Sequence, residues 1–166
     1  MNSSADEHRP FPLPHATTDL TLYFSSFRAG GFAPDPVGAV AGDGDLYMSE
    51  WKGGTFGAPV LVPGVNSEST DGQPNVRRDG REIFFFSTRP GGAGDPDIWS
   101  ATRERTSEPW SEPVNPGTAV NSPAGESRPS LSWDGRTLYF GSTRPGGDGE
   151  ADIHVTTRSR VTGLKP

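Results

Sequence analysis

Apolar and polar residues alternate in short runs along the chain, and this period predicts β-strands rather than helices. Residues 19–26, Asp-Leu-Thr-Leu-Tyr-Phe-Ser-Ser, alternate in this way and are rich in strand-forming residue types. Residues 151–158, Ala-Asp-Ile-His-Val-Thr-Thr-Arg, follow the same pattern. No run shows the spacing of a helical apolar stripe, so the predicted fold class is all-β.

The predicted strands belong to an internal repeat with a period of 55 residues. Asn-Ser-Glu-Ser-Thr-Asp-Gly-Gln-Pro at 66–74 returns at 121–129 as Asn-Ser-Pro-Ala-Gly-Glu-Ser-Arg-Pro. Three further landmarks return at the same offset without a gap: Asp-Gly-Arg at 79–81, Ser-Thr-Arg-Pro-Gly-Gly at 87–92, and Asp-Ile at 97–98.

A looser copy precedes these two. Residues 2–10 match 66–74 at an offset of 64, but Asp-Leu-Tyr at 45–47 matches 97–99 at an offset of 52. The shrinking offset indicates extra residues in the first copy, which we place in an inserted loop at 32–44. We therefore predict one segment over 1–166, with repeats at 2–65, 66–120 and 121–166.

Each repeat predicts a four-stranded antiparallel sheet. A short first strand leads into an Asp-Gly turn, a strong hairpin signal, and an apolar second strand follows at Glu82–Ser87 and Thr137–Ser142. The third strand opens on Asp-Ile or Asp-Leu. A proline lies inside each weak fourth strand, around 56–60 and 110–114, which places that strand at the sheet edge.

Such sheets are predicted to stack face to face as blades of a β-propeller, because one sheet alone cannot bury both faces. The expected shared apolar layers contain Phe84, Phe85, Phe86, Tyr139 and Phe140.

The repeated motif resembles a known family. Pro-x-x-x-x-Asp-Gly-Arg-x-(Leu/Ile)-(Tyr/Phe)-Phe-x-Ser-Thr-Arg-Pro-Gly-Gly, followed by Asp-Ile, is similar to the WD40-like (PD40) repeat of TolB-type β-propellers. The resemblance implies a bacterial propeller of the periplasm or extracellular space that binds proteins, or that accompanies a catalytic or peptidoglycan-binding module. It also implies rings that usually have six blades.

The chain departs from that pattern at both ends. Phe-Pro-Leu-Pro-His-Ala-Thr-Thr at 11–18 replaces the usual first strand and Asp-Gly turn of the first repeat. The third repeat is expected to lack its fourth strand, because the counterpart of Trp110 falls at position 165.

Three blades cannot close a ring, since propellers use about four to eight. Three arrangements remain open: part of a longer propeller, a homodimer that completes a six-bladed ring, and an open monomer. An open array would leave two sheet faces and a strand edge in water.

Composition and charge narrow the function classes. The chain contains 22 Gly, 17 Pro and no Cys, which excludes disulfides, thiolate metal sites and cysteine nucleophiles. A net charge of -6 with dispersed arginines predicts no nucleic-acid partner. No run is long and apolar enough for membrane insertion, and no signal peptide is recognisable in this chain.

Charged residues recur at three positions of the repeat: an arginine before the Gly-Gly loop, an aspartate opening the third strand, and an acid before the first-strand proline. In repeat order these are Arg28, Arg89 and Arg144; Asp45, Asp97 and Asp152; and Glu7, Asp71 and Glu126. The turn glycines Gly80 and Gly135 belong to the same signature.

Two interpretations of these charges are open. They could line a central channel that binds a small ligand or a peptide carboxylate, or they could form ion pairs in which arginine reaches a carboxylate and loop carbonyls. Recurrence in every copy favours the structural role, because a catalytic site normally occurs once per ring.

No cofactor is predicted. Carboxylates are dense at 43–45 and 148–152, which leaves calcium open, although the twelve-residue EF-hand pattern is missing. The three histidines show no metal-ligand spacing. The four tryptophans do not share one repeat position, and one or two on a loop face could contact a glycan or peptide.

We therefore predict a non-catalytic binding or scaffold module with a protein, peptide or glycan partner. The alternative is an accessory or catalytic propeller of a glycoside hydrolase or peptidase. A binding module should present an unrepeated exposed aromatic or charged cluster on one loop face, whereas an enzyme should show convergent carboxylates with perturbed pKa values.

Overall fold

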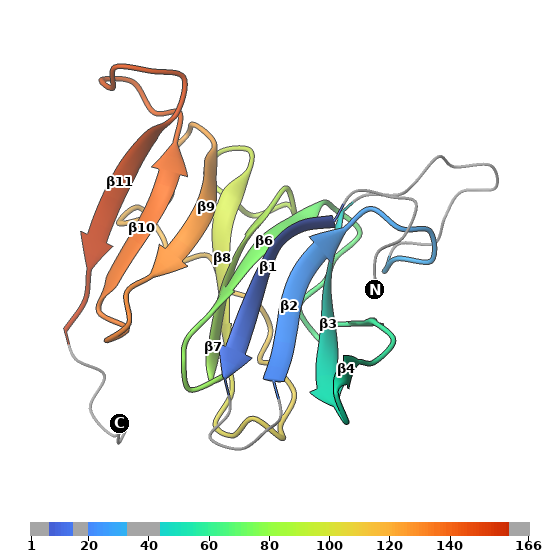
Figure 1. The fold of residues 1–166 in the computed structure, drawn as a ribbon. Coiled ribbons are helices and arrows are strands. Elements are labelled where there is room, and N and C mark those ends of the chain that lie inside the picture. The colour runs from blue at the N-terminus through green and yellow to red at the C-terminus, as the bar shows by residue number, and fades with distance from the viewer. Residues whose placement is uncertain (1–6, 15–19, 33–43, 160–166) are drawn as a thin grey trace.

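The computed structural model describes residues 7–14, 20–32 and 44–159, and in these ranges it contains strands and turns but no helix. The strands form three antiparallel sheets, which lie side by side in chain order (Figure 1). The all-β prediction is confirmed.

The first sheet has the order β1 (Glu7–Pro14), β2 (Leu20–Ser26), β3 (Asp45–Lys52), and β3 also pairs with β4 (Thr55–Phe56) and β5 (Val60–Leu61).

The proline-rich beginning of the first repeat forms a strand, which corrects the expectation that 11–18 replaces it. β1 pairs with β2 from Phe11↔Tyr23 to Pro14↔Leu20, with a bulge between His8 and Phe11. β1 tolerates its prolines because it is an edge strand with β2 as its single paired neighbour among the described residues. The predicted loop at 32–44 falls mostly on 33–43, which lie outside the described residues.

The second sheet has the order β6 (Asp71–Val76), β7 (Glu82–Ser87), β8 (Asp97–Thr102). Its predicted fourth strand is reduced to one bridge, in which Ser100 and Val114 exchange hydrogen bonds of 3.0 and 2.8 Å. The four-strand prediction is therefore wrong in detail for this sheet, although Ser111 N also donates to the Thr102 carbonyl of β8 at 2.7 Å.

The third sheet has the order β9 (Glu126–Leu131), β10 (Thr137–Ser142), β11 (Asp152–Thr157). β7 and β10 begin and end at the residues that the alternation predicted. β11 has β10 as its single partner within the described part of the chain, and the position of the predicted fourth strand, around 165, lies outside the described residues.

The first strands of the second and third sheets, β6 and β9, each carry a bulge whose central residue has left-handed backbone geometry, at Gln73 (φ 54°) and Arg128 (φ 57°). Beside the bulge, Gly72 pairs with Phe86 in the second sheet, whereas Ser127 pairs with Gly141 in the third. A Cβ on Gly72 would lie 2.5 Å from Phe86, so a small residue must face the ring. The two sheets therefore keep the same strand register, although the glycine lies on the first strand in the second sheet and on the second strand in the third sheet.

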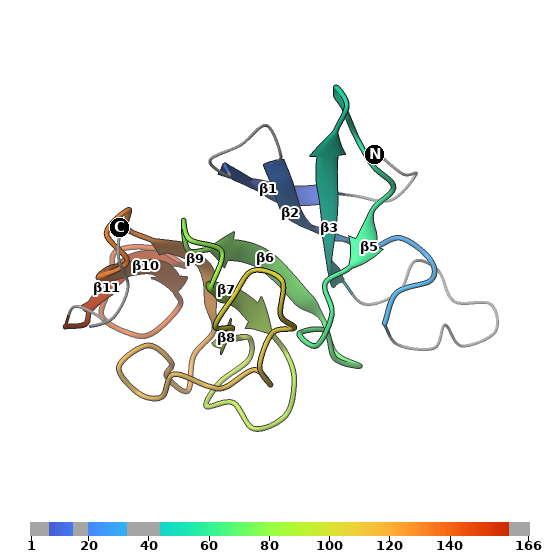
Figure 2. The same ribbon diagram turned by 90° about the horizontal axis from the view of Figure 1, so that it is seen from below.

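The sheets stack through two apolar clusters. One joins Tyr23 and Leu46 of the first sheet to Ile83 and Phe85 of the second. The other joins the second sheet to Leu138 and Phe140 of the third. From below, the sheets fan out with β1, β6 and β9 toward their shared side (Figure 2), as blades do around a propeller axis.

Four of the five predicted core aromatics are buried or partly buried, but Tyr139 is 46% exposed. The expectation for Tyr139 is therefore wrong, because its side chain lies on the face of the third sheet that has no neighbouring sheet among the described residues.

Candidate functional site

The arginines before the Gly-Gly loop bind carboxylates within their own repeat. Arg89 donates from Nε to Ser87 Oγ (2.9 Å) and from Nη2 to Asp71 Oδ1 (2.7 Å) and the Val65 carbonyl (2.6 Å). Asp71 is fully buried, so the guanidinium supplies the charge compensation that a buried carboxylate needs.

The third repeat has the same arrangement. Arg144 donates to Ser142 Oγ (2.9 Å), the Val120 carbonyl (2.6 Å) and Glu126 Oε1 (3.2 Å). In the first repeat Arg28 donates to Ser26 Oγ at 3.0 Å, and the side chain of Glu7 lies outside the described residues.

These arginines also lie over aromatic rings of their own sheets. Arg28 covers Phe24 and Tyr47, and Arg89 covers Phe85 and Trp99, at 4.7–5.4 Å from the ring centroids. Arg89 and Arg144 bind only their own blade and the residue that leads into it among these contacts, which is the arrangement of a structural clamp.

The recurring aspartates cap the Gly-Gly loop. Asp97 Oδ2 accepts hydrogen bonds from the amides of Ala93 (2.8 Å) and Gly94 (3.0 Å), and Asp45 Oδ2 accepts one from Phe32 (3.0 Å). In all three repeats a Cβ on the second glycine of the loop would overlap this carboxylate: Gly31 with Asp45, Gly92 with Asp97, and Gly147 with Asp152.

The turn glycines accept hydrogen bonds from two arginines that the sequence reasoning missed. Gly80 (φ 71°) and Gly135 (φ 70°) have left-handed geometry. Arg103 Nε donates to the Gly80 carbonyl at 2.6 Å, and Arg158 Nε donates to the Gly135 carbonyl at 2.8 Å. Their common signal in the sequence is Thr-Arg at 102–103 and 157–158.

The same two arginines reach the preceding sheet. Arg158 forms two hydrogen bonds to the Glu82 carboxylate (2.5 and 2.6 Å), and Arg103 Nη2 approaches Tyr23 Oη at 3.4 Å. They therefore connect neighbouring blades, unlike the clamps of Arg89 and Arg144.

Two buried asparagines were also missed as functional positions, although they open the repeat motif. Asn121 Oδ1 accepts from Ile98 N (2.9 Å) and its Nδ2 donates to Ile98 O (2.8 Å). Asn66 makes the same pair of bonds with Leu46. Each side-chain amide hydrogen-bonds to the backbone at the start of a third strand, and the Leu46 carbonyl accepts a further bond from the Val62 amide at 2.9 Å.

Three carboxyl groups among the described residues have shifted pKa values, and all three are lowered. Burial would raise the pKa of Glu126, but hydrogen bonds from Ser122, Ser142 and Arg144 outweigh it. Burial would likewise raise the pKa of Asp79, and Arg77 and Arg81 outweigh it. The Ser132 hydroxyl and the Arg136 amide lower the pKa of Asp134. These shifts fit ion-pair and hydrogen-bond acceptors rather than a general acid, whose pKa must be raised.

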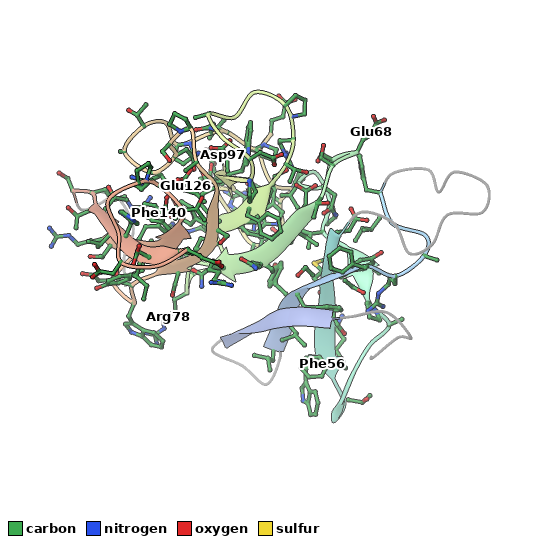
Figure 3. The ribbon with its side chains drawn as sticks, turned by 90° about the horizontal axis from the view of Figure 1, so that it is seen from above. Phe56, Glu68, Arg78, Asp97, Glu126 and Phe140 are labelled. Carbon is green, nitrogen blue, oxygen red and sulfur yellow. The ribbon has the colours of Figure 1, made fainter. Side chains whose placement is uncertain are left out.

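One exposed aromatic residue stands on a loop face without a repeated counterpart. Trp133, in the turn between β9 and β10, is 73% exposed, and the Arg78 guanidinium lies 4.1 Å from its ring centroid. Arg78 occupies the equivalent position in the second repeat. Figure 3 shows Arg78 at the periphery, pointing away from the sheets. We name Trp133, Arg78 and the neighbouring exposed Arg136 the Trp133 platform.

Among the described residues, no group of three or more His, Asp and Glu side chains is placed to hold a metal ion. None of these residues forms a helix long and apolar enough to cross a membrane.

The fold is thus a set of stacked antiparallel sheets arranged as propeller blades. Among solved structures the chain is similar to TolB from Acinetobacter baumannii, at 16% identity and a TM-score of 0.42, over 99% of this chain and 43% of that chain. The chain therefore spans less than half the length of that TolB. No family model and no curated protein matches the sequence, so the PD40 resemblance stays a prediction.

Proposed function

We propose that the chain is a non-catalytic binding and scaffold module that recognises its partner through the Trp133 platform. The observation that carries this proposal is the 73% exposure of Trp133 beside Arg78, on a turn where the second repeat has no aromatic residue. A large aromatic side chain left in water on a loop face is typical of a recognition residue.

The chemistry of the platform favours a ligand with a flat apolar surface and an anionic group. Arg78 contacts the indole, and neither its guanidinium nor that of Arg136 forms an ion pair or hydrogen bond among the described residues. An indole face binds a sugar ring, a proline or an aromatic side chain, and a free guanidinium binds a carboxylate. A peptide or a glycan that carries carboxylates meets both requirements.

The platform is assembled from two sheets that are held together tightly. Arg78 comes from the second sheet and Trp133 from the third. The sheets are connected by Arg158 and Glu82, by Arg128 N and Gln73 Oε1 (2.8 Å), and by Leu131 N and Asn75 Oδ1 (2.9 Å). A platform fixed in this way loses little conformational freedom on binding, which favours affinity.

The proposed location is the periplasm or the extracellular space, and this rests on the resemblance of the repeat motif alone. The shifted carboxyl groups all have lowered pKa values and hold structural hydrogen bonds, which favours a binding module over the hydrolase alternative.

The test is a binding screen against two probe sets: a glycan array with neutral and uronate-containing members, and an array of acidic and neutral peptides. Trp133→Ala and Arg78→Ala should each weaken binding at least about tenfold while the circular dichroism spectrum stays unchanged. Tyr139→Ala, which removes an exposed aromatic residue from outside the platform, is the matched control. Equal losses for Trp133→Ala and Tyr139→Ala, or no bound probe, would refute the proposal.

A further inference from the structure

Each sheet has two apolar faces that can be followed from repeat to repeat. We call the face toward the next sheet in the chain the front face and the opposite one the back face. Equivalent front-face pairs are Tyr23 and Leu46, Phe84 and Ile98, and Tyr139 and Ile153.

The front face is closed in two sheets and open in the third. Tyr23 and Leu46 are 2% and 0% exposed under the second sheet, and Phe84 and Ile98 are 6% and 0% exposed under the third. Their counterparts Tyr139 and Ile153 are 46% and 82% exposed. Val155, on the same side of β11 as Ile153, is 59% exposed. An open apolar face of this kind marks an interaction surface.

The other end of the stack is closed, which corrects the expectation that an open array leaves both end faces in water. The back face of the first sheet carries Leu22, Phe24 and Tyr47, which are 9%, 3% and 4% exposed. Phe56 and Leu61 pack against them, and Arg28 lies over the two aromatic rings. Only the front face of the third sheet therefore remains open among the described end faces.

We propose that this open face docks a further blade of the same repeat, one whose back face presents an aliphatic residue and a phenylalanine. Both existing junctions have this chemistry: Ile83 and Phe85 cover the first front face, and Leu138 and Phe140 cover the second. The inference goes beyond the proposed binding function, since it assigns a second surface with a different partner.

Polar groups at the junction agree with this assignment. In the second junction the amide of Leu131 donates to Asn75 Oδ1 on the sheet before it. The residue equivalent to Asn75 in the third sheet is Ser130, an exposed hydroxyl that can accept the same bond from an incoming first strand.

A second copy of this chain has, among its described residues, no open back face with which to cover this surface. A second copy offers three back faces, of which those of its second and third sheets are already covered by their own junctions. The remaining one, at Leu22 and Phe24, is buried within the chain.

The test uses a longer chain in which a second copy of residues 112–166 is placed after Pro166. This addition is one period long, so it keeps the 55-residue register. Because the sequence contains no Cys, Ile153→Cys in the original part gives a single thiol on the face. Its reaction with a maleimide should be at least about tenfold slower in the extended chain than in the native one. Ala119→Cys, on an exposed turn, should react at the same rate in both.

The matched control carries Leu138→Asp and Phe140→Asp within the appended copy, and there Ile153→Cys should react as fast as in the native chain. Unchanged reactivity in the intact extension would overturn the proposal. So would a native chain that is a stable dimer with Ile153→Cys already protected, since a second copy would then cover the face. Ligand binding on the arrays is measured with the native chain, so it tests the proposed function independently.

Discussion

Arg158, directly after β11, and Glu82, at the start of β7, form a bidentate ion pair, with Nη1–Oε1 and Nη2–Oε2 distances of 2.5 and 2.6 Å. Glu82 is 5% exposed and also accepts from Arg77 at 3.0 Å. The pair connects two blades across 76 residues of sequence. The ion pair therefore belongs to the contact between the two sheets rather than to either sheet alone.

We expect Arg158→Met to destabilise the chain by about 1–3 kcal/mol, because a buried carboxylate loses two charged hydrogen bonds while Arg77 remains. The free energy of unfolding in urea measures the effect. Arg105→Met, which removes an exposed pair with Glu108, should cost no more than about 0.5 kcal/mol. Equal losses of unfolding free energy for Arg158→Met and Arg105→Met would show that the Arg158–Glu82 pair does not stabilise the contact between the sheets.

Asn121→Ala should cost about 2–4 kcal/mol, since the N–H and C=O of the fully buried Ile98 lose their amide partner together. Asn121→Asp keeps the acceptor for the Ile98 amide but places an oxygen against the Ile98 carbonyl, so it should also destabilise. Chemical denaturation compares the variants with the parent chain, and a loss below about 0.5 kcal/mol for Asn121→Ala would rule out this role.

Gly92→Ala should destabilise the chain by about 2–4 kcal/mol. The added methyl group would overlap the carboxylate of Asp97, which is 1% exposed, and displace it from the amides of Ala93 and Gly94. Gly149→Ala is the matched control, because a Cβ there meets nothing within 4 Å. Thermal unfolding followed by circular dichroism should separate the two variants, and identical midpoints would disprove the steric argument.

Stability should decrease as the pH falls below about 4.5, the ordinary pKa of a glutamate. The pKa of Glu126 is lower in the folded chain than in the unfolded one, so its ionised form favours folding. That contribution is complete above the unfolded pKa and is lost as the pH falls through the folded pKa.

Glu126→Gln should reduce stability at pH 7 by about 1.5–3 kcal/mol and flatten the dependence below pH 4.5. Urea midpoints measured between pH 3 and pH 7 test this expectation. Glu112→Gln, a change on an exposed side chain, should leave the profile of the parent chain intact. A parallel profile for Glu126→Gln would show that another group controls the acid response.

The local alternation of apolar and polar residues was sufficient to predict much of the fold. The alternation at 82–87 and 137–142 predicted β7 and β10 residue by residue. The structure joins Arg89 to Asp71 and Arg144 to Glu126, four of the charged residues that recurrence had singled out. It does not join Asp97 to these pairs, because that carboxylate binds loop amides instead.

Other features could not be derived from local pattern. The prolines of 10–14 argue against a strand, yet β1 forms there because an edge strand needs hydrogen bonds on one side only. Trp133 and Arg78 occupy equivalent repeat positions, and nothing in the sequence indicates that neighbouring blades bring them into contact.

The sequence by itself determined the period, the strands β7 and β10 and the recurring charged positions, because alternation, turn glycines and repeated motifs act over a few residues. Only the tertiary structure decided which faces are covered. Ile98 and Ile153 share the same local motif, yet one is 0% and the other 82% exposed. The difference is the presence of a neighbouring sheet, and burial depends on that neighbour rather than on the residue's own strand.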